Sequence, residues 1–309
     1  MLLFAVIFVT VAITAHELVT EWPQVLLRMA LFCTTIVLVN LWSSGAPGRS
    51  LGAFKTFYIA PLIPVFFKTA EFISFPLHGH DFDSWLIAAD RMMFGVNPTQ
   101  WIVQHIPLWP ALTEYFCICY SLFFFLPTAV AIEIFLRARR KERNGLPAED
   151  RGDVDKIFFV IAYGFLLSYV CYFLLPAIGP RFTLHNFLDT SHDMPGLFLA
   201  DPIRIMLDAG ENILPGMPLA QILHVVTRDT FPSGHCDVTL LTIIFAFVYK
   251  TRVRYVVAFL GASLILSTVY LRYHYVVDLL AGALVAMVTL YTWQWLRDRM
   301  IDLKVKLGG

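Results

Sequence analysis

The sequence predicts an all-α fold, a polytopic membrane helix bundle of about six to eight transmembrane helices. Two observations carry this prediction. Hydrophobic residues make up 58% of the 309 residues and charged residues only 15%, and the mean hydropathy is +0.68. Apolar runs of membrane-spanning length also recur along the chain. Both properties are typical of an integral membrane protein.

Eight apolar segments are the candidates for these helices. They lie near residues 2–15, 23–42, 55–75, 111–136, 156–177, 237–250, 253–270 and 274–296. The first is shorter than the ~20 residues that a bilayer core requires, so it is either a helix or a signal-like anchor. Because no small-residue cleavage site stands out after it, we expect a helix. The sixth and seventh segments need flanking residues to cross the bilayer completely.

Basic residues cluster in three places that alternating spans bring to one side of the membrane. These are RARRKER at 137–143, KTRVR at 250–254 and the tail that begins with RDR at 297. The positive-inside rule makes that side cytoplasmic, together with the C-terminus. The long 178–232 loop then lies on the extracytoplasmic face, periplasmic or lumenal. Its mixed polarity predicts either an interfacial helix on the membrane surface or a lid over a site.

The charge balance and the cysteines exclude other classes of protein. Lys and Arg number 23 and Asp and Glu number 23, whereas a nucleic-acid-binding protein needs a concentrated excess of basic residues. We therefore expect no nucleic acid as a partner. The five cysteines are odd in number, and all but Cys236 fall inside apolar runs, so they predict no disulfide framework.

Two histidines stand at the boundaries of apolar segments. His235 ends the stretch FPSGH, directly before an apolar run. His274 and Asp278 are four residues apart, so on a helix they share one face about 6 Å apart along the axis. An acid placed there holds one imidazole nitrogen and leaves the other free to act as a base or nucleophile. The alternative is an inert pair at a helix end, but ionisable residues within a membrane usually mark function.

Neighbouring residues add the features of an anion site. Ser233 and Gly234 offer a hydroxyl and an unobstructed N–H at a helix N-terminus, where unpaired N–H groups and the helix dipole favour an anion. Arg181, in PAIGPRF, offers a guanidinium that can hold phosphate oxygens in bidentate fashion. Together with the two histidines and Asp278, these residues predict a phosphate-binding site at the extracytoplasmic boundary.

FPSGH, followed about 40 residues later by a His-x-x-x-Asp helix, resembles the type 2 phosphatidic acid phosphatase superfamily. Its members act on lipid phosphates without a metal. The second motif of that superfamily, Pro-Ser-Gly-His, is complete at 232–235. The third motif, Ser-Arg, five residues, His, three residues, Asp, is matched at Ser267, His274 and Asp278. Thr268 stands at its arginine position, and Arg272 is the candidate to replace that arginine.

The first motif, Lys, six residues, Arg-Pro, is absent. Relative to Arg181, Leu174 occupies the lysine position and Phe182 the proline position. The sequence is similar instead to the branch that contains inositol phosphorylceramide synthases, which transfer a phosphate-bearing headgroup from one lipid to another acceptor. PAIGPRF, the Tyr-Leu-x-x-His-Tyr-x-x-Asp form of the third motif and DRMMFGVNP at 90–98 carry this second resemblance.

The second resemblance implies how the chain is divided. It extends over most of the chain from about residue 55. We therefore expect N-terminal membrane helices in residues 1–54. Residues 55–309 are then a lipid phosphatase/phosphotransferase-like membrane domain with a six-helix catalytic core.

The resemblance also implies a metal-independent lipid phosphotransferase or phosphatase that needs no cofactor. His274, oriented by Asp278, attacks phosphorus to form a phosphohistidine, and protonated His235 gives a proton to the leaving oxygen. The implied phosphate ligands are Arg181, Ser233, Gly234 and Arg272. An acceptor hydroxyl or water then resolves the intermediate, which decides between transferase and hydrolase. The expected partners are membrane lipids.

Two other interpretations are weighed against this one. A lipid-binding or transport protein without catalysis would carry ionisable residues through the depth of several spans, but here they cluster at one boundary. HGHDFD at 78–83 contains four side chains that can bind a metal. Short polar loops often contain such runs, and no second cluster completes a coordination shell, so we expect no metal there.

Overall fold

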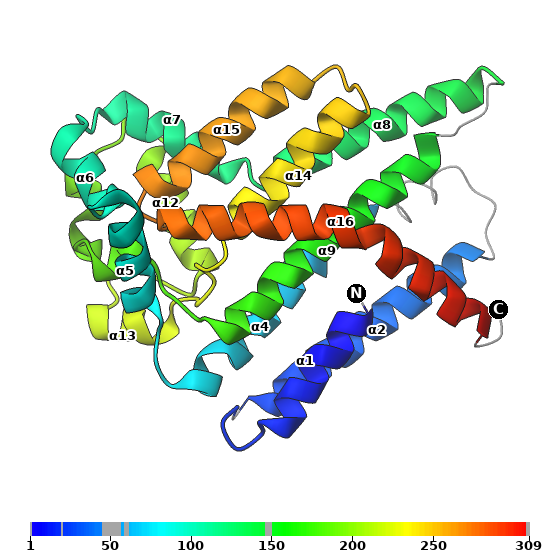
Figure 1. Ribbon diagram of the computed structural model, residues 1–309, viewed down its shortest axis with the longest axis horizontal. Coiled ribbons are helices and arrows are strands. Elements are labelled where there is room, and N and C mark those ends of the chain that lie inside the picture. The colour runs from blue at the N-terminus through cyan, green and yellow to red at the C-terminus, as the bar shows by residue number, and fades with distance from the viewer. Residues whose placement is uncertain (1, 20, 45–56, 59–61, 146–149, 307–309) are drawn as a thin grey trace.

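The computed structural model describes residues 2–19, 21–44, 57–58, 62–145 and 150–306 of the chain. Within these ranges every regular element is a helix, which confirms the all-α prediction. The longer helices are α1 (Leu2–Thr14), α2 (Trp22–Ser44), α4 (Ile63–His78), α7 (Pro110–Ser121), α8 (Phe125–Arg143), α9 (Asp150–Leu174), α14 (Gly234–Val248), α15 (Arg254–Tyr270) and α16 (Val276–Lys306). They form a bundle in which α8, α9, α14 and α15 run side by side (Figure 1).

The lengths of the helices agree with a membrane bundle. Among the described residues, three helices are long and apolar enough to cross a membrane: Trp22–Val39 within α2, Gly152–Leu174 within α9 and Val276–Ile301 within α16. A fourth span results if α7 and α8 are taken together. Three shorter apolar helices, Ala5–Thr14, Gly234–Val248 and Arg254–Tyr270, belong to the predicted first, sixth and seventh segments.

The predicted span at 111–136 is not one straight helix. α7 ends at Ser121, α8 begins at Phe125, and the two helices are bent by 53° at this break. Pro127 explains the position of the break, because it has no N–H to donate to the carbonyl of Phe123 four residues earlier, and its ring would clash there. Tyr120, near the end of α7, and Phe123, within the break, both contact the ring of His235.

Helix α14 is the centre of the bundle and packs against α8, α9, α15 and α16. Its residues Val238, Leu241 and Phe245 are buried in the main hydrophobic core. α16 approaches the start of α14 so closely that a Cβ at Gly282 would meet the carbonyl oxygen of Ser233 at 2.4 Å. Glycine at 282 therefore allows the two segments that carry the predicted site to meet.

The N-terminal helices pack onto this bundle. The ring of Phe8 in α1 makes edge contacts with Phe66 of α4, at 5.3 Å between centroids, and with Phe173 of α9, at 4.9 Å. The predicted domain boundary after residue 54 lies outside the described residues, and so do several residues at the start of the predicted segment 55–75. The division into two domains stays a prediction.

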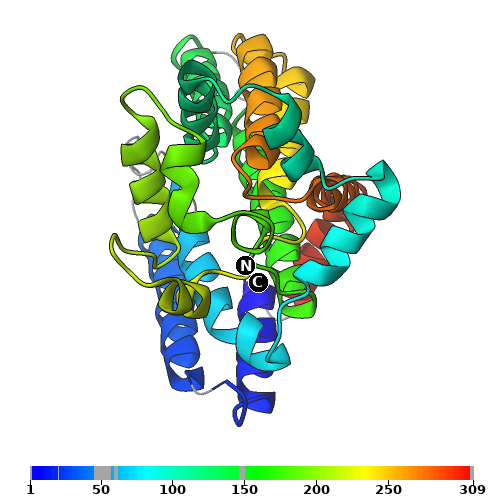
Figure 2. The ribbon, with the colours of Figure 1, turned by 90° about the vertical axis from the view of Figure 1, so that its left-hand side faces the viewer.

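Seven further helical elements are described, and most lie at one end of the bundle. They are α5 (Asp83–Phe94), α6 (Pro98–His105), α10 (Pro180–Thr183), η2 (Phe187–Asp189), α11 (Thr190–Asp193), α12 (Ala200–Gly210) and α13 (Leu219–Val225). Figure 2 looks onto this end, where α14 and α16 also begin. The 178–232 segment thus lies over the end of the bundle that carries both histidines.

The start of helix α12 within this segment is held to the bundle by a carboxylate of α7. Glu114 of α7 accepts hydrogen bonds from the backbone N–H groups of residues 197–200. Ile203 and Leu207 pack inward, whereas the side chains of Ile205 and Met206 are 53% and 58% exposed. An exposed apolar face fits the predicted interfacial helix, and the inward face fits the predicted lid.

The basic clusters lie at the other end of the helices. Arg137 of α8 donates to the carbonyl of Tyr249 at 2.9 Å, and the backbone N–H of Arg252 donates to Glu133 at 2.7 Å, so the clusters at 137–143 and 250–254 are neighbours. This arrangement agrees with the predicted grouping of positive charge. The compartment that each end faces stays a prediction.

Candidate active site

The two predicted catalytic histidines contact each other. Nε2 of His274 lies 3.3 Å from Nδ1 of His235, and the ring centroids are 5.4 Å apart. His235 is in the first turn of α14, and His274 is in the short loop between α15 and α16. The carbonyl of Thr268 accepts the N–H groups of Tyr273 and His274 at 2.9 and 3.1 Å, which turns the chain at the end of α15 and aims His274 at α14.

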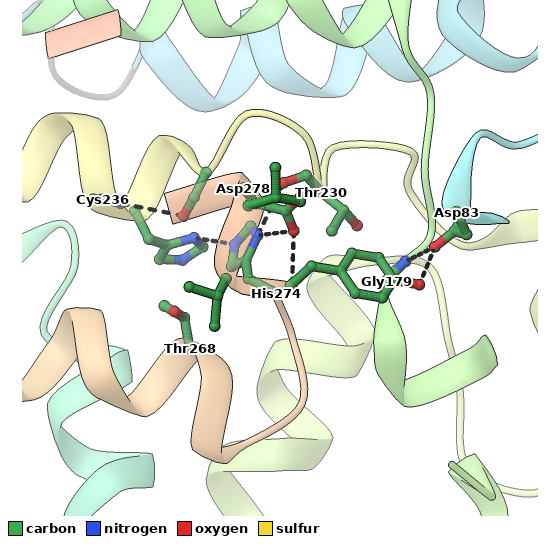
Figure 3. A network of polar contacts seen from close by, with 12 residues as sticks. Asp83, Gly179, Thr230, Cys236, Thr268, His274 and Asp278 are labelled. Atoms are coloured by element: carbon green, nitrogen blue, oxygen red, sulfur yellow. Dashed lines mark hydrogen bonds and ion pairs between the residues drawn. The ribbon is translucent and has the colours of Figure 1, made fainter. Parts of the chain in front are cut away.

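A backbone carbonyl sets the tautomer of His274. Nδ1 of His274 lies 2.9 Å from the carbonyl oxygen of Thr230 and 3.4 Å from Oδ2 of Asp278 (Figure 3). A carbonyl oxygen can only accept, so Nδ1 carries the proton and Nε2 carries the lone pair. The sequence predicted Asp278 in this role, but Thr230 is the nearer acceptor and Asp278 is the second.

Asp278 instead forms its hydrogen bonds with backbone N–H groups. Its Oδ2 accepts the N–H of Tyr275 at 2.8 Å, and its own carbonyl accepts the N–H of Ser233 at 2.9 Å. Asp278 is fully buried, and within the described part of the chain its Oδ1 has no hydrogen-bond partner. The residue therefore joins the FPSGH segment to the start of α16, in addition to facing His274.

Burial keeps His274 neutral. It lowers the pKa of His274 to about 4, against the Asp229 carboxylate and the Thr230 carbonyl, which both raise it. Near neutral pH the Nε2 lone pair is therefore free of a proton. In this structure it accepts from His235 Nδ1, so the predicted attack on phosphorus requires that hydrogen bond to break.

Aromatic rings hold His235 in place. Its ring centroid is 4.5 Å from that of Tyr120 and 4.2 Å from that of Phe123. Tyr120 stacks in turn on Tyr273 at 4.5 Å, and the Arg181 guanidinium carbon lies 4.4 Å from the Tyr273 ring centroid. A continuous column of planar groups therefore joins the predicted general acid to the predicted phosphate ligand.

The guanidinium of Arg181 is already paired with two carboxylates. It donates to Asp208 at 2.9 Å and to Glu211, both at the end of α12, and its residue is only 5% exposed. These two charges raise the pKa of Arg181 above its ordinary value, in spite of burial. Burial raises the pKa of Glu211 to about 7, against the Arg181 charge that lowers it. A phosphate that binds Arg181 in bidentate fashion has to displace these carboxylates.

Three cavities meet around Arg181 and His235. The histidine cavity, about 20 Å³, is lined by Arg181, Glu211, Asp229, His235, Tyr273 and His274, among others. The apolar cavity, about 280 Å³, is walled by aromatic side chains of α4, α7, α9 and the break between α7 and α8. It shares Glu211, Asp229 and His235 with the histidine cavity. The α12 cavity, about 230 Å³, contains Arg204 and Asp208 and shares Arg181 and Tyr273.

A comparison with known families decides the classification. The profile of the PAP2 superfamily matches residues 84–292, which is more than half of the chain. The chain belongs to the PAP2 superfamily. No curated protein and no solved structure matched it. Membership of the PAP2 superfamily supports a phosphatase or phosphotransferase of lipid phosphates, and the closer assignment to the inositol phosphorylceramide synthase branch stays a prediction.

Of the other predicted phosphate ligands of this PAP2 protein, Gly234 lines one of the three cavities, and Ser233 and Arg272 line none of them. Ser233 is fully buried, and its hydroxyl caps α14 by accepting the N–H of Cys236 at 3.2 Å. Gly234 lines the apolar cavity, where a Cβ would meet the hydroxyl of Tyr172 at 2.9 Å. Arg272 is 1% exposed, and its Nη1 donates to Asp193 at 3.0 Å. The roles of these three residues in binding phosphate stay predictions.

The positions that depart from the PAP2 motifs are also described. Thr268, at the arginine position of the third motif, is fully buried and donates its hydroxyl hydrogen to the carbonyl of Ile265 at 2.7 Å. Leu174, at the lysine position of the first motif, is 63% exposed at the end of α9. Neither residue can therefore supply a charge to the site.

The run HGHDFD divides its side chains among separate partners. His78 contacts the carbonyl of Phe173 at 2.6 Å, and Asp81 pairs with Arg228 at 3.2 Å. Asp83 accepts from backbone N–H groups at 178 and 179. In the part of the chain that the structure describes, no group of three His, Cys, Asp or Glu residues is arranged to hold a metal ion. The metal independence of the PAP2 reaction here stays a prediction.

Proposed function

We propose that this PAP2 protein transfers a phosphate-bearing headgroup from a lipid donor to a lipid or alcohol acceptor. The observation that carries the proposal is the arrangement of the cavities. Two large cavities, about 280 and 230 Å³, reach the same small histidine cavity through different residues. A transferase needs room for a second substrate beside the reacting phosphorus, whereas a hydrolase needs room only for water.

The first half of the proposed reaction makes a phosphohistidine. The lone pair on Nε2 of His274 attacks phosphorus while the bond to the donor alkoxide breaks. His235, in its protonated imidazolium form, gives a proton to the departing oxygen and becomes neutral. Arg181, released from Asp208 and Glu211, holds the charge that develops on the nonbridging oxygens. The donor leaves as a neutral alcohol.

The second half reverses these roles. The hydroxyl of the acceptor attacks phosphorus, its proton passes to His235, and the bond between phosphorus and Nε2 of His274 breaks. The aromatic walls of the apolar cavity support the placement of hydrocarbon chains there, because they border His235 directly. The carbonyl of Thr230 and the carboxylate of Asp278 stabilise the positive charge that His274 carries in the intermediate.

A hydrolase is the second candidate, and the histidine cavity is the observation that favours it. Its volume of about 20 Å³ is enough for one water molecule, which needs roughly 10–15 Å³. In this version the protein is a lipid phosphate or polyprenyl pyrophosphate phosphatase, and water takes the place of the acceptor alcohol.

The test is an assay of the purified protein in detergent with a panel of lipid phosphomonoesters, pyrophosphates and phosphodiesters. Each substrate is supplied with and without a lipid alcohol, in the presence of a chelator. Headgroup transfer that depends on the alcohol supports the proposal, and phosphate release that ignores the alcohol supports the hydrolase. If neither reaction occurs with wild-type protein, or only an added metal restores it, the proposed chemistry is wrong.

A further inference from the structure

Helix α5 carries two buried carboxylates that the proposed chemistry does not use. Asp83 is 5% exposed and Asp90 is 1% exposed. They are seven residues apart, close to two helical turns, so they lie on the same face of α5. That face is turned toward the loops that carry Arg181 and His274 and toward the start of α16, which carries Asp278.

Asp83 joins two of these loops. Its Oδ2 accepts the N–H of Ile178 at 3.0 Å and its Oδ1 accepts the N–H of Gly179 at 2.8 Å, just before Arg181. The same Oδ1 accepts the hydroxyl of Tyr275 at 2.8 Å, next to His274 in sequence. Figure 3 shows Asp83 at the end of the hydrogen-bond network that begins at the histidines.

The two loops are also in direct contact. The N–H of Arg181 donates to the carbonyl of Arg272 at 2.9 Å, and the hydroxyls of Thr183 and Tyr275 are 2.6 Å apart. Gly179 has a φ of +93°, and a Cβ there would meet the carbonyl oxygen of Tyr273 at 2.7 Å. The loops are therefore close-fitting, and the carboxylate of Asp83 is the group that both of them contact.

Asp90 likewise accepts hydrogen bonds from backbone N–H groups, at the start of α16. Its Oδ2 accepts the N–H of Val276 at 3.1 Å and its Oδ1 accepts the N–H of Val277 at 2.8 Å. These N–H groups belong to the first turn of α16 and have no partner within that helix. A neighbouring helix thus caps α16 directly before Asp278.

We propose that Asp83 is a positioning residue that fixes the Arg181 loop relative to His274, with Asp90 holding the start of α16. The inference rests on the proposed function, because it assigns Asp83 the task of keeping the phosphate ligand at its working distance from the nucleophile. Asp83 lines none of the three cavities, so the proposal gives it no direct contact with a substrate. Its effect reaches the reaction through Arg181.

The substitution Asp83→Asn tests this directly. An amide has the size of the carboxylate but only one accepting oxygen, so it cannot satisfy Ile178 N–H, Gly179 N–H and the Tyr275 hydroxyl together. We expect kcat/KM to fall by about 10²-fold, since displacement of a positioning group by about 1 Å costs roughly that much. The matched control is Asp81→Asn, which lies two residues away and pairs with Arg228 instead of the two loops. It should retain wild-type kinetics.

A functional double-mutant cycle with Arg181→Ala separates positioning from general destabilisation. If Asp83 acts through Arg181, Asp83→Asn should cost at least tenfold less in kcat/KM in the Arg181→Ala background than in wild type. Equal losses in both backgrounds, or no loss in wild type, would overturn the proposal. Thermal unfolding of each variant is measured alongside.

A second measurement, of vanadate binding, tests the positioning role of Asp83 even if the proposed lipid reaction does not occur. Vanadate, a phosphate mimic, is titrated into the purified protein and the shift in unfolding temperature is recorded. Asp83→Asn should lower the apparent vanadate affinity by about tenfold, and Asp81→Asn should leave it unchanged. Equal affinity in Asp83→Asn and wild type would reject the positioning role. Vanadate binding with no turnover of any lipid would reject the proposed function alone.

Discussion

Nε2 of His274 lies 3.3 Å from Nδ1 of His235, so the lone pair of one imidazole already receives the proton of the other. In this resting arrangement the predicted nucleophile and the predicted acid face each other without a substrate between them. The contact gives each ring a defined tautomer, because His274 Nδ1 donates to a carbonyl. The two rings therefore differ in their hydrogen-bond partners, and their predicted roles can be separated by mutation.

The first prediction separates them by the leaving group. His235→Ala should strongly slow reaction of a lipid substrate, because a general acid contributes about 10² to 10⁴ in rate. With a nitrophenyl phosphate ester, whose leaving group needs no proton, the same variant should lose much less. His274→Ala should abolish both reactions. Steady-state rates with the two substrates measure this, and an equal loss for both in His235→Ala would mean that the roles are exchanged.

The second prediction concerns pH and Glu211. With the pKa of Glu211 raised to about 7, its carboxylate takes up a proton as the pH falls from 8 to 6 and stops competing for Arg181. Asp208 remains to hold the guanidinium, and Asp229 lines the same cavity. The KM for a phosphodiester, which does not titrate in this range, should therefore be lower at pH 6 than at pH 8.

The matched variant is Glu211→Gln, which is neutral at every pH. Its KM should be low and nearly independent of pH between 6 and 8. The contribution of Glu211 to the free energy of unfolding should also be larger at pH 6 than at pH 8. A carboxyl whose pKa is higher in the folded than in the unfolded chain stabilises the fold at low pH, and this contribution is lost as the pH rises through the folded pKa. A wild-type KM that falls with rising pH, or a Glu211→Gln variant that keeps the full pH dependence, contradicts this role for Glu211.

The third prediction concerns the packing of the two motif segments. Gly282→Ala places a Cβ 2.4 Å from the carbonyl oxygen of Ser233 and must push α16 away from the start of α14. We expect a loss of about 1–3 kcal/mol of stability together with a loss of activity. Gly152→Ala in α9 is the control, because, among the described residues, no atom beyond its chain neighbours and its own helix backbone lies within 4 Å of the added Cβ. It should leave activity unchanged and stabilise the protein slightly. Thermal unfolding in detergent compares the two.

The fourth prediction is the orientation in the membrane. A cysteine at Leu214, which is 58% exposed in the 178–232 segment, should react with a membrane-impermeant thiol reagent added outside intact cells. A cysteine at Asp298, whose side chain is 63% exposed near the C-terminus, should react only after the membrane is opened. The described native cysteines are buried or half-buried, so the background should be low. The reverse labelling pattern would place the site on the cytoplasmic side.

The sequence predicted those parts of the site that depend on residue type and spacing. The sequence predicted that His235, His274 and Asp278 lie close together, because α14 and α15 form a hairpin and α16 begins at the end where α14 begins. The structure has these residues in contact. Thr230 could not be predicted, because its contribution is a backbone carbonyl, which any residue provides. The break before α8 had a signal in Pro127, but the apolar composition on both sides concealed it.

Other residues of the site were missed because their partners are distant in sequence. Glu211 and Asp208 pair with Arg181, about 30 residues earlier in the chain, and no local pattern predicts such a pair. Asp83 drew attention as a possible metal ligand, whereas its neighbours in space are the N–H groups of residues 178 and 179. A carboxylate in a polar run has the same sequence signature for either use.

The most direct test of the central claim is to trap the intermediate. The protein is mixed with a lipid donor labelled in its phosphate, stopped within one turnover in alkali, where phosphohistidine survives, and digested for mass spectrometry. We predict a phosphate-bearing adduct on His274, absent from His274→Ala and increased when the acceptor alcohol is withheld. An adduct on His235, or turnover of the lipid with no adduct on either histidine under any stopping condition, would contradict the account.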